Sequence, residues 1–198
     1  RARFLREART MATVEHAHVV RVYSFGEAAG SAYLVMEYVA GESLSERLKR
    51  TRQLDATEAI KITRQVAEAL DAAWEQHLVH RDIKPSNILV TLHDGVPVPK
   101  VIDFGVAKAI EQKLTERTLF TQHGTLVGTL EYMSPEQAEM SALGVDTRRD
   151  IYSLGVLLYE LLTGSTPLSR RWMREAAFAE ILRVIKEDEP PRPSTRLS

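Results

Sequence analysis

Cysteine is absent from the 198 residues of this chain. Its absence excludes disulfides, thiolate chemistry and zinc sites with cysteine ligands, and it is consistent with a reducing compartment. Long hydrophobic runs are also lacking, since stretches such as LGVLLYELL are far too short to span a bilayer. No signal peptide precedes the first helix-forming segment. The sequence therefore predicts no membrane-spanning segment in this chain.

An excess of one charge is lacking as well. The chain has 26 Lys and Arg residues against 27 Asp and Glu residues, with a net charge of -1 and an isoelectric point near 6.7. No basic field therefore favours nucleic acid or an anionic membrane as the partner. What the chain does have is 44% hydrophobic and 27% charged residues, the composition of one globular domain. Its function must be inferred from local sites.

Hydrophobic periodicity predicts the first half of the fold. Apolar residues recur at helical spacing in segment 1–14, and two β-rich runs around a glycine-containing turn at 18–39 predict an antiparallel hairpin. A short helix is expected near 43–50 and a long one over 54–77, whose first turn, DATE, has the spacing of a capping box. The long helix is expected to bury one stripe of residues: Ile62, Val66, Leu70 and Trp74.

The second half is predicted to be mainly helical. Two short strands are expected around the motifs HRDIKPSNILV and VIDFGVA, followed by a threonine-rich stretch without periodicity at about 108–130. Segment 150–164 is apolar nearly all round, which predicts a helix buried at the centre of a helical lobe and stopped by Gly164. A further amphipathic helix is expected over 174–188.

The two strand-flanked motifs indicate chemistry. Segment 80–90 holds Asp82 and Asn87 on one irregular loop, and Asp103 ends the following strand. Two carboxylates and an amide that converge supply hard oxygen ligands, which suit Mg²⁺ held partly by the phosphates of a nucleotide. A carboxylate left off the metal can accept a proton from an attacking hydroxyl, and Lys84 can neutralise charge on a transferring phosphoryl group.

Four motifs, in order along the chain, resemble those of a known family. HRDIKPSN resembles the catalytic loop of eukaryotic-type protein kinases, DFG their magnesium motif, GTLEYMSPE their substrate-binding loop, and DIYSLG the start of their central helix. The resemblance runs from Arg1 to about Pro193, and the sequence is similar in texture to bacterial serine/threonine kinases. It implies an α+β, protein-kinase-like fold. Residues 1–40 would be a remnant of the small lobe and hinge, and 41–198 a mostly helical large lobe that is incomplete at its C-terminal end.

The resemblance implies a role for each matching residue. Asp82 would be the catalytic base and Lys84 the lysine that contacts phosphate, while Asn87 and Asp103 would bind the metal. ATP and Mg²⁺ are therefore the expected cofactors. The residues expected to contact the nucleotide, beginning with the hinge EYV, are Glu37, Val39, Asn87, Leu89 and Asp103.

The resemblance also implies regulatory residues. Glu7 lies at the position of the family's helix-C glutamate, and Arg81 would be an unpaired cation until a phosphothreonine arrives from the activation loop. Thr121 is the first candidate for that phosphate and Thr125 the next, whereas Thr129 would brace the catalytic pair. The expected regulatory spine consists of Met11, Val22, His80 and Phe104, anchored by Asp150.

The chain departs from the family in the part that would hold the phosphates of the nucleotide. It contains no glycine-rich GxGxxG loop and no VAIK-like lysine. Glu7 is therefore expected to have no partner, because the missing lysine is the residue that it pairs with in the family. The phosphates of a nucleotide would also lose their main cationic anchor, so the 198 residues alone are expected to transfer phosphate poorly.

The favoured interpretation is an ATP-dependent serine/threonine protein kinase that acts on protein substrates. A second copy of the kinase is a candidate partner for trans-autophosphorylation, and the domain is expected in the cytoplasm, with any membrane anchor outside this chain. One alternative is a pseudokinase or docking module that folds without catalysis. Another is a kinase for small molecules, against which Lys84, the threonine-rich loop and MSPE argue, because those features serve a peptide acceptor.

Overall fold

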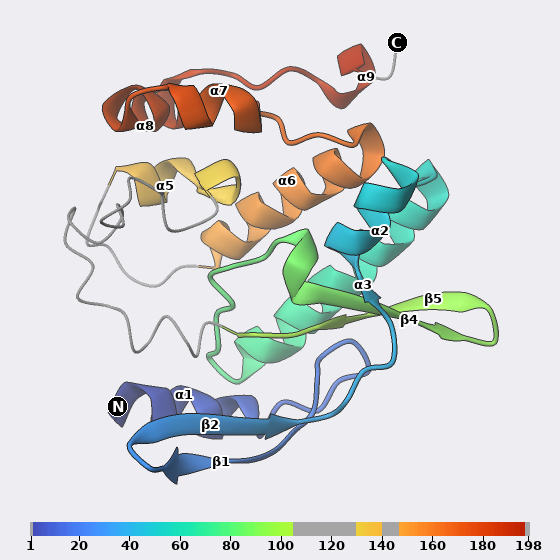
Figure 1. Cartoon of the computed structure of the whole chain (residues 1–198), viewed down its shortest axis with the longest axis vertical. Helices are drawn as coiled ribbons and strands as arrows, with labels where there is room; N and C mark the ends of the chain where they lie inside the picture. The colour runs from blue at the N-terminus through green and yellow to red at the C-terminus, as the bar shows by residue number, and fades with distance from the viewer. Residues whose placement is uncertain (1, 105–129, 140–146, 197–198) are drawn as a thin grey trace.

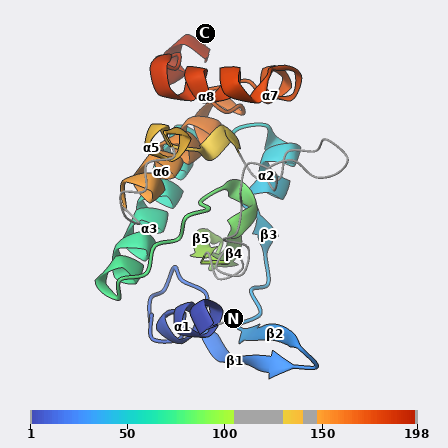
Figure 2. The same cartoon turned by 90° about the vertical axis from the view of Figure 1, so that its left-hand side faces the viewer.

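The structure is a computed structural model that describes residues 2–104, 130–139 and 147–196. Its elements stack along the long axis of the molecule, with a small strand-containing part at one end and helices at the other (Figure 1). A view from the side shows the same order, and the chain passes from the small part to the large part through one extended segment before β3 (Figure 2). The predicted α+β architecture is confirmed.

The small part contains one helix and one hairpin. α1 (Ala2–Met11) is followed by β1 (Val22–Ala28) and β2 (Ser31–Met36), which pair antiparallel as predicted. Met11 is fully buried in the main core, which the hairpin contributes to mainly through one strand residue, Val22. Most other side chains of the hairpin are exposed or half-exposed, because only one edge of this two-stranded sheet packs on the rest of the chain.

A second sheet lies between the small part and the helices. Its strand order is β3 (Glu42–Ser43), β4 (Ile88–His93) and β5 (Val96–Val101), all antiparallel. Gly41 enters this sheet against the backbone of β4, where a Cβ atom would lie 2.2 Å from the carbonyl oxygen of Val90. Only glycine permits that close approach, which lets the short strand β3 pair with β4.

Two capped helices follow β3 in the chain. α2 (Leu44–Thr51) begins with a capping box, in which the Ser43 side chain accepts from the N–H of Glu46 and Glu46 binds back. α3 (Ala56–Glu75) begins at Asp55, which accepts from the Thr57 N–H at 2.8 Å. The capping box predicted for α3 is not the contact that forms, because the side chain of Glu58 bonds Arg47 of α2 instead.

The buried face of α3 agrees with the prediction only in part. Ile62 and Val66 are fully buried, and Leu70 is half-buried against the core. Trp74, predicted as the fourth member of the stripe, is 43% exposed. Ala73 takes the buried position beside it, because a strict four-residue spacing drifts about 40° around a helix at each step and the buried stripe runs instead through Ala69 and Ala73.

α6 (Arg148–Thr163) crosses α3 and forms the centre of the large part, as Figure 1 shows. It ends at Gly164, whose φ of 73° is left-handed, so the predicted stop is confirmed. The helix is not buried all round, since Ile151 is 65% exposed near its start. Its apolar pattern therefore over-predicted burial on the side that faces away from the core.

The C-terminal helices form a second, smaller core. The single helix predicted over 174–188 is two helices, α7 (Arg170–Glu175) and α8 (Phe178–Glu187), separated by extended residues at 176 and 177. This break allows both helices to pack on the same cluster with α5 (Pro135–Ala138). The buried members of that cluster are Leu130, Ala138, Met173, Ile181 and Ile185. α9 (Pro193–Arg196) is the last short helix of the described chain.

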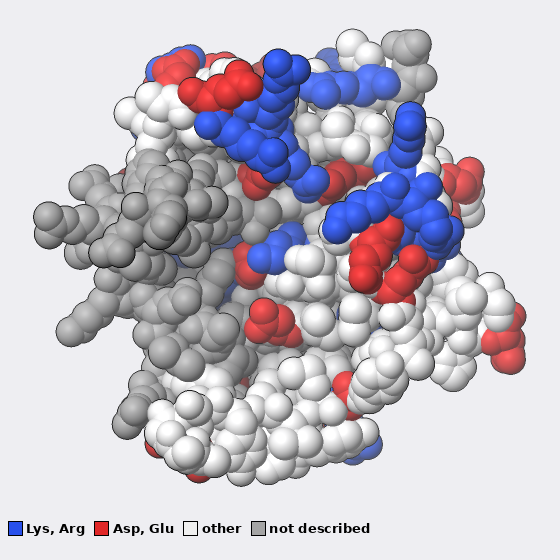
Figure 3. Space-filling model, viewed as in Figure 1, with Lys and Arg blue, Asp and Glu red and all other residues white. Residues whose placement is uncertain are grey.

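Charged side chains are distributed unevenly over the surface. Figure 3 shows lysine, arginine and acidic residues concentrated over the helical part, while the face over β1 and β2 is almost free of charge. Within the described ranges, none of the helices combines the length and the apolar character that crossing a membrane requires.

Candidate functional site

The HRDIKPSN loop (80–87) is held in place by hydrogen bonds to the first turn of α6. Asp150 is buried there, and its two carboxylate oxygens accept the N–H groups of His80 and Arg81, each at 2.8 Å. Arg81 has a left-handed backbone with φ of 68°, a conformation that is unfavourable for a residue with a side chain. The two hydrogen bonds hold this strained turn in place, so the anchoring role expected of Asp150 is confirmed.

His80 connects the loop to the strand that precedes DFG. Its Nε2–H donates to the carbonyl oxygen of Ile102 at 2.9 Å, and its ring lies 4.7 Å from the ring of Phe104. Burial lowers the pKa of His80, although the negative charge of Asp150 opposes that effect. The ring is therefore neutral, and its Nδ1 accepts the N–H of Asp82 at 3.2 Å.

Three of the four expected spine residues belong to the main hydrophobic core, and the fourth, His80, contacts Phe104 of that core. Met11 comes from α1, Val22 from the start of β1, and Phe104 from the residue after Asp103; together with His80 all are buried. These residues come from the small part, the DFG segment and the HRDIKPSN loop. Packing across these segments explains how residues far apart in the sequence meet at one site.

Asp82, Lys84 and Asn87 converge on the open side of the loop. Lys84 Nζ lies 2.7 Å from the Asp82 carboxylate. Asn87 Nδ2 donates to the backbone oxygen of Asp82 at 2.9 Å and to its carboxylate at 3.2 Å. Asn87 is buried at the end of the 3-10 turn η1 (Pro85–Asn87), where Pro85 supplies a fixed first φ angle. Asp82 and Asn87, two members of the predicted convergence, thus meet in the structure, together with Lys84, which was expected close to Asp82.

Asp103 reaches the same place from β5. The N–H of Ile102 donates to the backbone oxygen of Asn87 at 2.9 Å, which places the end of β5 beside the HRDIKPSN loop. Asp103 is exposed and has a left-handed backbone with φ of 62°. The charges of Asp82 and Asp103 both act on the ring of His80. Negative charge is therefore concentrated at the mouth of the site.

The donor set fits Mg²⁺ bound together with phosphates. Because Asn87 turns its amide nitrogen toward Asp82, its carbonyl oxygen is directed away from that carboxylate and accepts the Ser86 hydroxyl at 3.3 Å. That oxygen and the Asp103 carboxylate are hard ligands of the type that Mg²⁺ prefers. Over the described part of the chain, no group of three or more His, Cys, Asp or Glu residues could hold a metal by itself. Further ligands would thus come from the nucleotide and water.

The hinge segment after β2 is tied to the second sheet. Lys100 Nζ of β5 lies 2.9 Å from the Glu37 carboxylate, which also accepts the Arg21 N–H at 3.3 Å. Burial alone would raise the pKa of Glu37, but the bonds from Lys100 and Arg21 and their charges hold it below its ordinary value. The N–H of Glu37 donates to the backbone oxygen of Arg21 at 2.8 Å. Val39 and Leu89 are half-buried.

The expectation that Glu7 has no partner is wrong. Its carboxylate lies 3.0 Å from Arg81 Nη1, and the two side chains are only 10% and 17% exposed. Arg81 is consequently not the unpaired cation that was expected. The physical reason is that a charge in a partly buried space is costly when it is isolated, and an opposite charge beside it offsets that cost. The sequence did not indicate this pair, whose members are 74 positions apart.

Three of the expected regulatory residues, Thr121, Thr125 and Thr129, lie outside the described residues. Immediately after them, the short 3-10 helix η3 (Leu130–Tyr132) is anchored on α6. The Ser153 hydroxyl donates to the backbone oxygen of Tyr132 at 2.9 Å, and the Tyr132 hydroxyl bonds the buried carboxylate of Glu160.

Sequence reasoning missed the cluster around Glu160. Arg170 Nη2 lies 2.7 Å from this carboxylate, and its Nε lies 3.5 Å from Glu131. Burial and the charge of Glu160 raise the pKa of Tyr132, so the tyrosine remains a hydrogen-bond donor. A signal was present in the sequence, because a glutamate within the apolar face of a central helix requires a partner.

The geometry agrees with comparisons to known proteins. The family model for the protein kinase domain matches residues 1–197. The chain belongs to the protein kinase domain family. Among solved structures, the kinase domain of PknI from Mycobacterium tuberculosis, a double mutant, has a TM-score of 0.71 and 25% identity, covering 99% of this chain and 64% of that one.

Curated relatives of this kinase domain are bacterial serine/threonine-protein kinases. PknB of Mycobacterium leprae is 38% identical over 198 residues, which cover 98% of this chain and 30% of the relative. Pkn3 of Myxococcus xanthus is 39% identical over 203 residues, covering 100% and 36%. PknA of Mycobacterium tuberculosis is 40% identical over 198 residues, covering 96% and 42%. The chain thus spans less than half the length of these relatives.

Proposed function

We propose that this kinase domain transfers the γ-phosphoryl group of ATP to serine or threonine hydroxyls of proteins. The observation that carries the proposal is the arrangement around Asp82. Its carboxylate lies 2.7 Å from Lys84 Nζ and accepts from Asn87 Nδ2 at 3.2 Å. This arrangement gathers one carboxylate, one cation and one amide group on the HRDIKPSN loop.

The chain's own residues account for the proton and the developing charge. Asp82 would accept the proton of the acceptor hydroxyl as its oxygen bonds the γ-phosphorus and the bond from phosphorus to the bridging oxygen breaks. Lys84, hydrogen-bonded to Asp82, would offset charge on the transferring group. Asn87 and Asp103 would hold Mg²⁺. When bound, ATP supplies the phosphoryl group and Mg²⁺ neutralises charge on its phosphates.

The nucleotide base would lie against the hinge. Glu37 is held in place by Lys100 and Arg21, so the following residues, including Val39, start from a fixed backbone position. Leu89 on β4 would supply an apolar contact from the large part. These contacts position the base and are consistent with the family, in which adenine binds the hinge backbone.

Protein acceptors with serine or threonine are supported by the relatives, all of which are named serine/threonine-protein kinases. A second copy of the domain would be one such acceptor, and the cytoplasm the compartment in which ATP is present. Phosphate on Thr121 or Thr125 would have to compete with Glu7 for Arg81, because the Glu7 carboxylate already lies 3.0 Å from that guanidinium. Phosphorylation would then release Glu7.

The test is phosphate incorporation by the full-length protein that contains this chain. Radiolabelled ATP, Mg²⁺ and a generic protein substrate are supplied to the unmodified protein and to Asp82→Asn. Loss of the general base should lower the rate about 10² to 10⁴-fold. Asp94→Asn is the matched control, because Asp94 lies in the exposed turn between β4 and β5 with a left-handed φ of 50° that asparagine tolerates.

Either outcome distinguishes the two leading interpretations. Transfer that depends on Asp82 and survives Asp94→Asn supports a kinase. A folded full-length protein that incorporates no phosphate, or equally much after Asp82→Asn, would mean that the domain is a pseudokinase or docking module. Nucleotide binding measured on the same samples then separates a catalytically silent ATP binder from a pure docking domain.

A further inference from the structure

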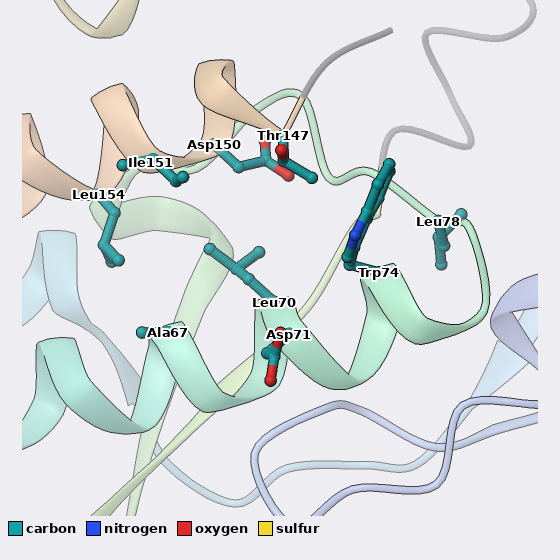
Figure 4. Close-up of a pocket in the computed structure, with 9 residues that line it drawn as sticks. All are labelled: Ala67, Leu70, Asp71, Trp74, Leu78, Thr147, Asp150, Ile151 and Leu154. Carbon is teal, nitrogen blue, oxygen red and sulfur yellow. The ribbon is translucent and has the colours of Figure 1, made fainter.

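A groove opens between α3 and α6, and its lining includes none of the residues to which the phosphoryl transfer is assigned. Its volume is about 230 Å³. The close-up in Figure 4 shows Leu70 directed from α3 toward α6 and Leu154 directed from α6 toward α3. The apolar part of the lining consists of Ala67, Leu70, Leu78, Ile151 and Leu154.

The two large apolar side chains at the rim are the ones whose burial was over-predicted. Trp74 is 43% exposed and Ile151 is 65% exposed, and both line the groove. Single exposed apolar residues are ordinary on protein surfaces. Two of them that border one concave apolar site mark a candidate binding site for a ligand with an apolar surface. The Trp74 ring extends from α3 toward the start of α6 (Figure 4).

The charge of the groove selects the sign of its ligand. Asp71 and Asp150 line it, and among the described residues no lysine, arginine or histidine does. Asp150 is already engaged by the N–H groups of His80 and Arg81. Asp71 is exposed, and in the described ranges no cationic side chain pairs with it. A carboxylate one helical turn from an indole forms a pair that suits a cation, through charge and through the ring face.

The volume restricts the size of the ligand. A cavity of about 150 Å³ holds benzene, whereas pockets for drug-sized molecules are about 300 to 1,000 Å³. At about 230 Å³ the groove has room for one ring with a short chain. A ligand of that size would fill the groove, and an anion there would meet two carboxylates.

We propose that this groove binds a small amphiphilic cation, composed of one aromatic ring and an alkylammonium group. The ring lies between Leu70 and Leu154 and beside the Trp74 indole, and the ammonium group faces Asp71. Because the groove also borders Asp150, a ligand there touches the residue that holds the HRDIKPSN loop. The site does not depend on the proposed phosphoryl transfer, so the two ideas can fail separately.

The probe is phenethylammonium, followed by tryptophan fluorescence. The chain has two tryptophans, so Trp172→Phe leaves Trp74 as the reporter while keeping an aromatic ring in α7. 2-Phenylethanol has the same shape without the charge, and 3-phenylpropionate reverses it. Asp71→Asn removes the charge with little change in shape. Glu75→Gln is the matched control, since Glu75 is an exposed carboxylate on the same helix that does not line the groove.

The expected result is a saturable change in Trp74 emission, with phenethylammonium binding more tightly than the alcohol and the carboxylate weakest. Asp71→Asn should weaken phenethylammonium about three-fold to five-fold, the range of a partly exposed charge pair, and leave the alcohol unchanged. Glu75→Gln should change neither affinity. A linear, non-saturating response, or equal affinity for the carboxylate, would overturn the proposal.

A second measurement removes dependence on the Trp172→Phe variant. The unsubstituted chain labelled with 5-fluorotryptophan gives separate ¹⁹F signals for its two tryptophans, assigned with Trp74→Phe. Phenethylammonium should shift the Trp74 signal and leave that of Trp172 in place. Equal shifts of both signals would indicate non-specific association and refute the assigned site.

Discussion

Replacing Asp150 tests how the HRDIKPSN loop is held. Asp150 is 6% exposed, and its carboxylate accepts the N–H groups of His80 and Arg81 at 2.8 Å each. In Asp150→Asn, one side-chain oxygen remains an acceptor. The new NH₂ group faces a backbone N–H group, from which it cannot accept a hydrogen bond. One charge-assisted bond is lost and the other becomes neutral.

The magnitude follows from those two bonds. A hydrogen bond to a charged group contributes about 1.5 to 3 kcal/mol, and a neutral one about half as much. The expected loss in the free energy of unfolding is therefore about 2 to 4 kcal/mol, a large part of the roughly 5 to 15 kcal/mol typical of a domain. The left-handed backbone of Arg81 adds to the effect, because those bonds also offset its strain.

Urea unfolding followed by circular dichroism measures this loss. Asp188→Asn is the matched control, because Asp188 is 49% exposed and its contact with Arg183 is 3.4 Å long. That exposed pair should contribute less than about 1 kcal/mol. Amide hydrogen exchange provides a local readout, since the N–H groups of His80 and Arg81 should exchange faster in Asp150→Asn alone. A loss no greater than that of the control, with unchanged exchange, would refute the reasoning.

Three further changes test other parts of the structure. Because the pKa of buried His80 lies below its ordinary value of 6.5, the unfolded chain binds the proton first as the pH falls. The free energy of unfolding should therefore be greatest above about pH 6.5 and decrease below it by up to about 1.4 kcal/mol per pH unit. In urea titrations His80→Gln should reduce this slope, and an unchanged slope in that variant would contradict the prediction. Gly164→Ala places a Cβ atom 2.6 Å from the Arg52 carbonyl oxygen at a φ of 73°, so thermal unfolding should show a loss of more than about 1 kcal/mol, and an unchanged melting temperature would contradict it. Arg170→Met leaves the Glu160 carboxylate without its cation, and because Arg170 is half-exposed we expect a loss of about 1 to 2 kcal/mol in urea, which Glu160→Gln in the same chain should largely restore.

The sequence by itself determined the fold class and most of the proposed site. Helical and strand periodicity predicted α1, the β1–β2 hairpin, α2, α3 and α6, because alternation and helical spacing are local properties of the chain. The irregular, proline-interrupted loop after α3 brought Asp82, Lys84 and Asn87 together, and that convergence is also local. Gly164 ends α6 for a local reason as well, because glycine readily adopts the left-handed backbone conformation that terminates a helix.

Burial could not be predicted with the same accuracy. Trp74 follows the buried spacing of α3, yet the small residue Ala73 faces the core and the indole stays at the surface. The helix predicted over 174–188 breaks at two alanines, both good helix formers, because the break lets α7 and α8 reach one cluster. At this break, packing against other segments outweighs a local helix preference of less than about 1 kcal/mol per residue.

Only the tertiary structure decided the electrostatic pairings. Glu58 bonds Arg47 of α2 instead of capping its own helix, and Glu7 of α1 meets Arg81 from the HRDIKPSN loop. Charge acts at short range between any groups that the fold brings together, whatever their separation in the chain. The sequence therefore determined which residues carry the chemistry, and the packing of distant segments determined which charges face one another.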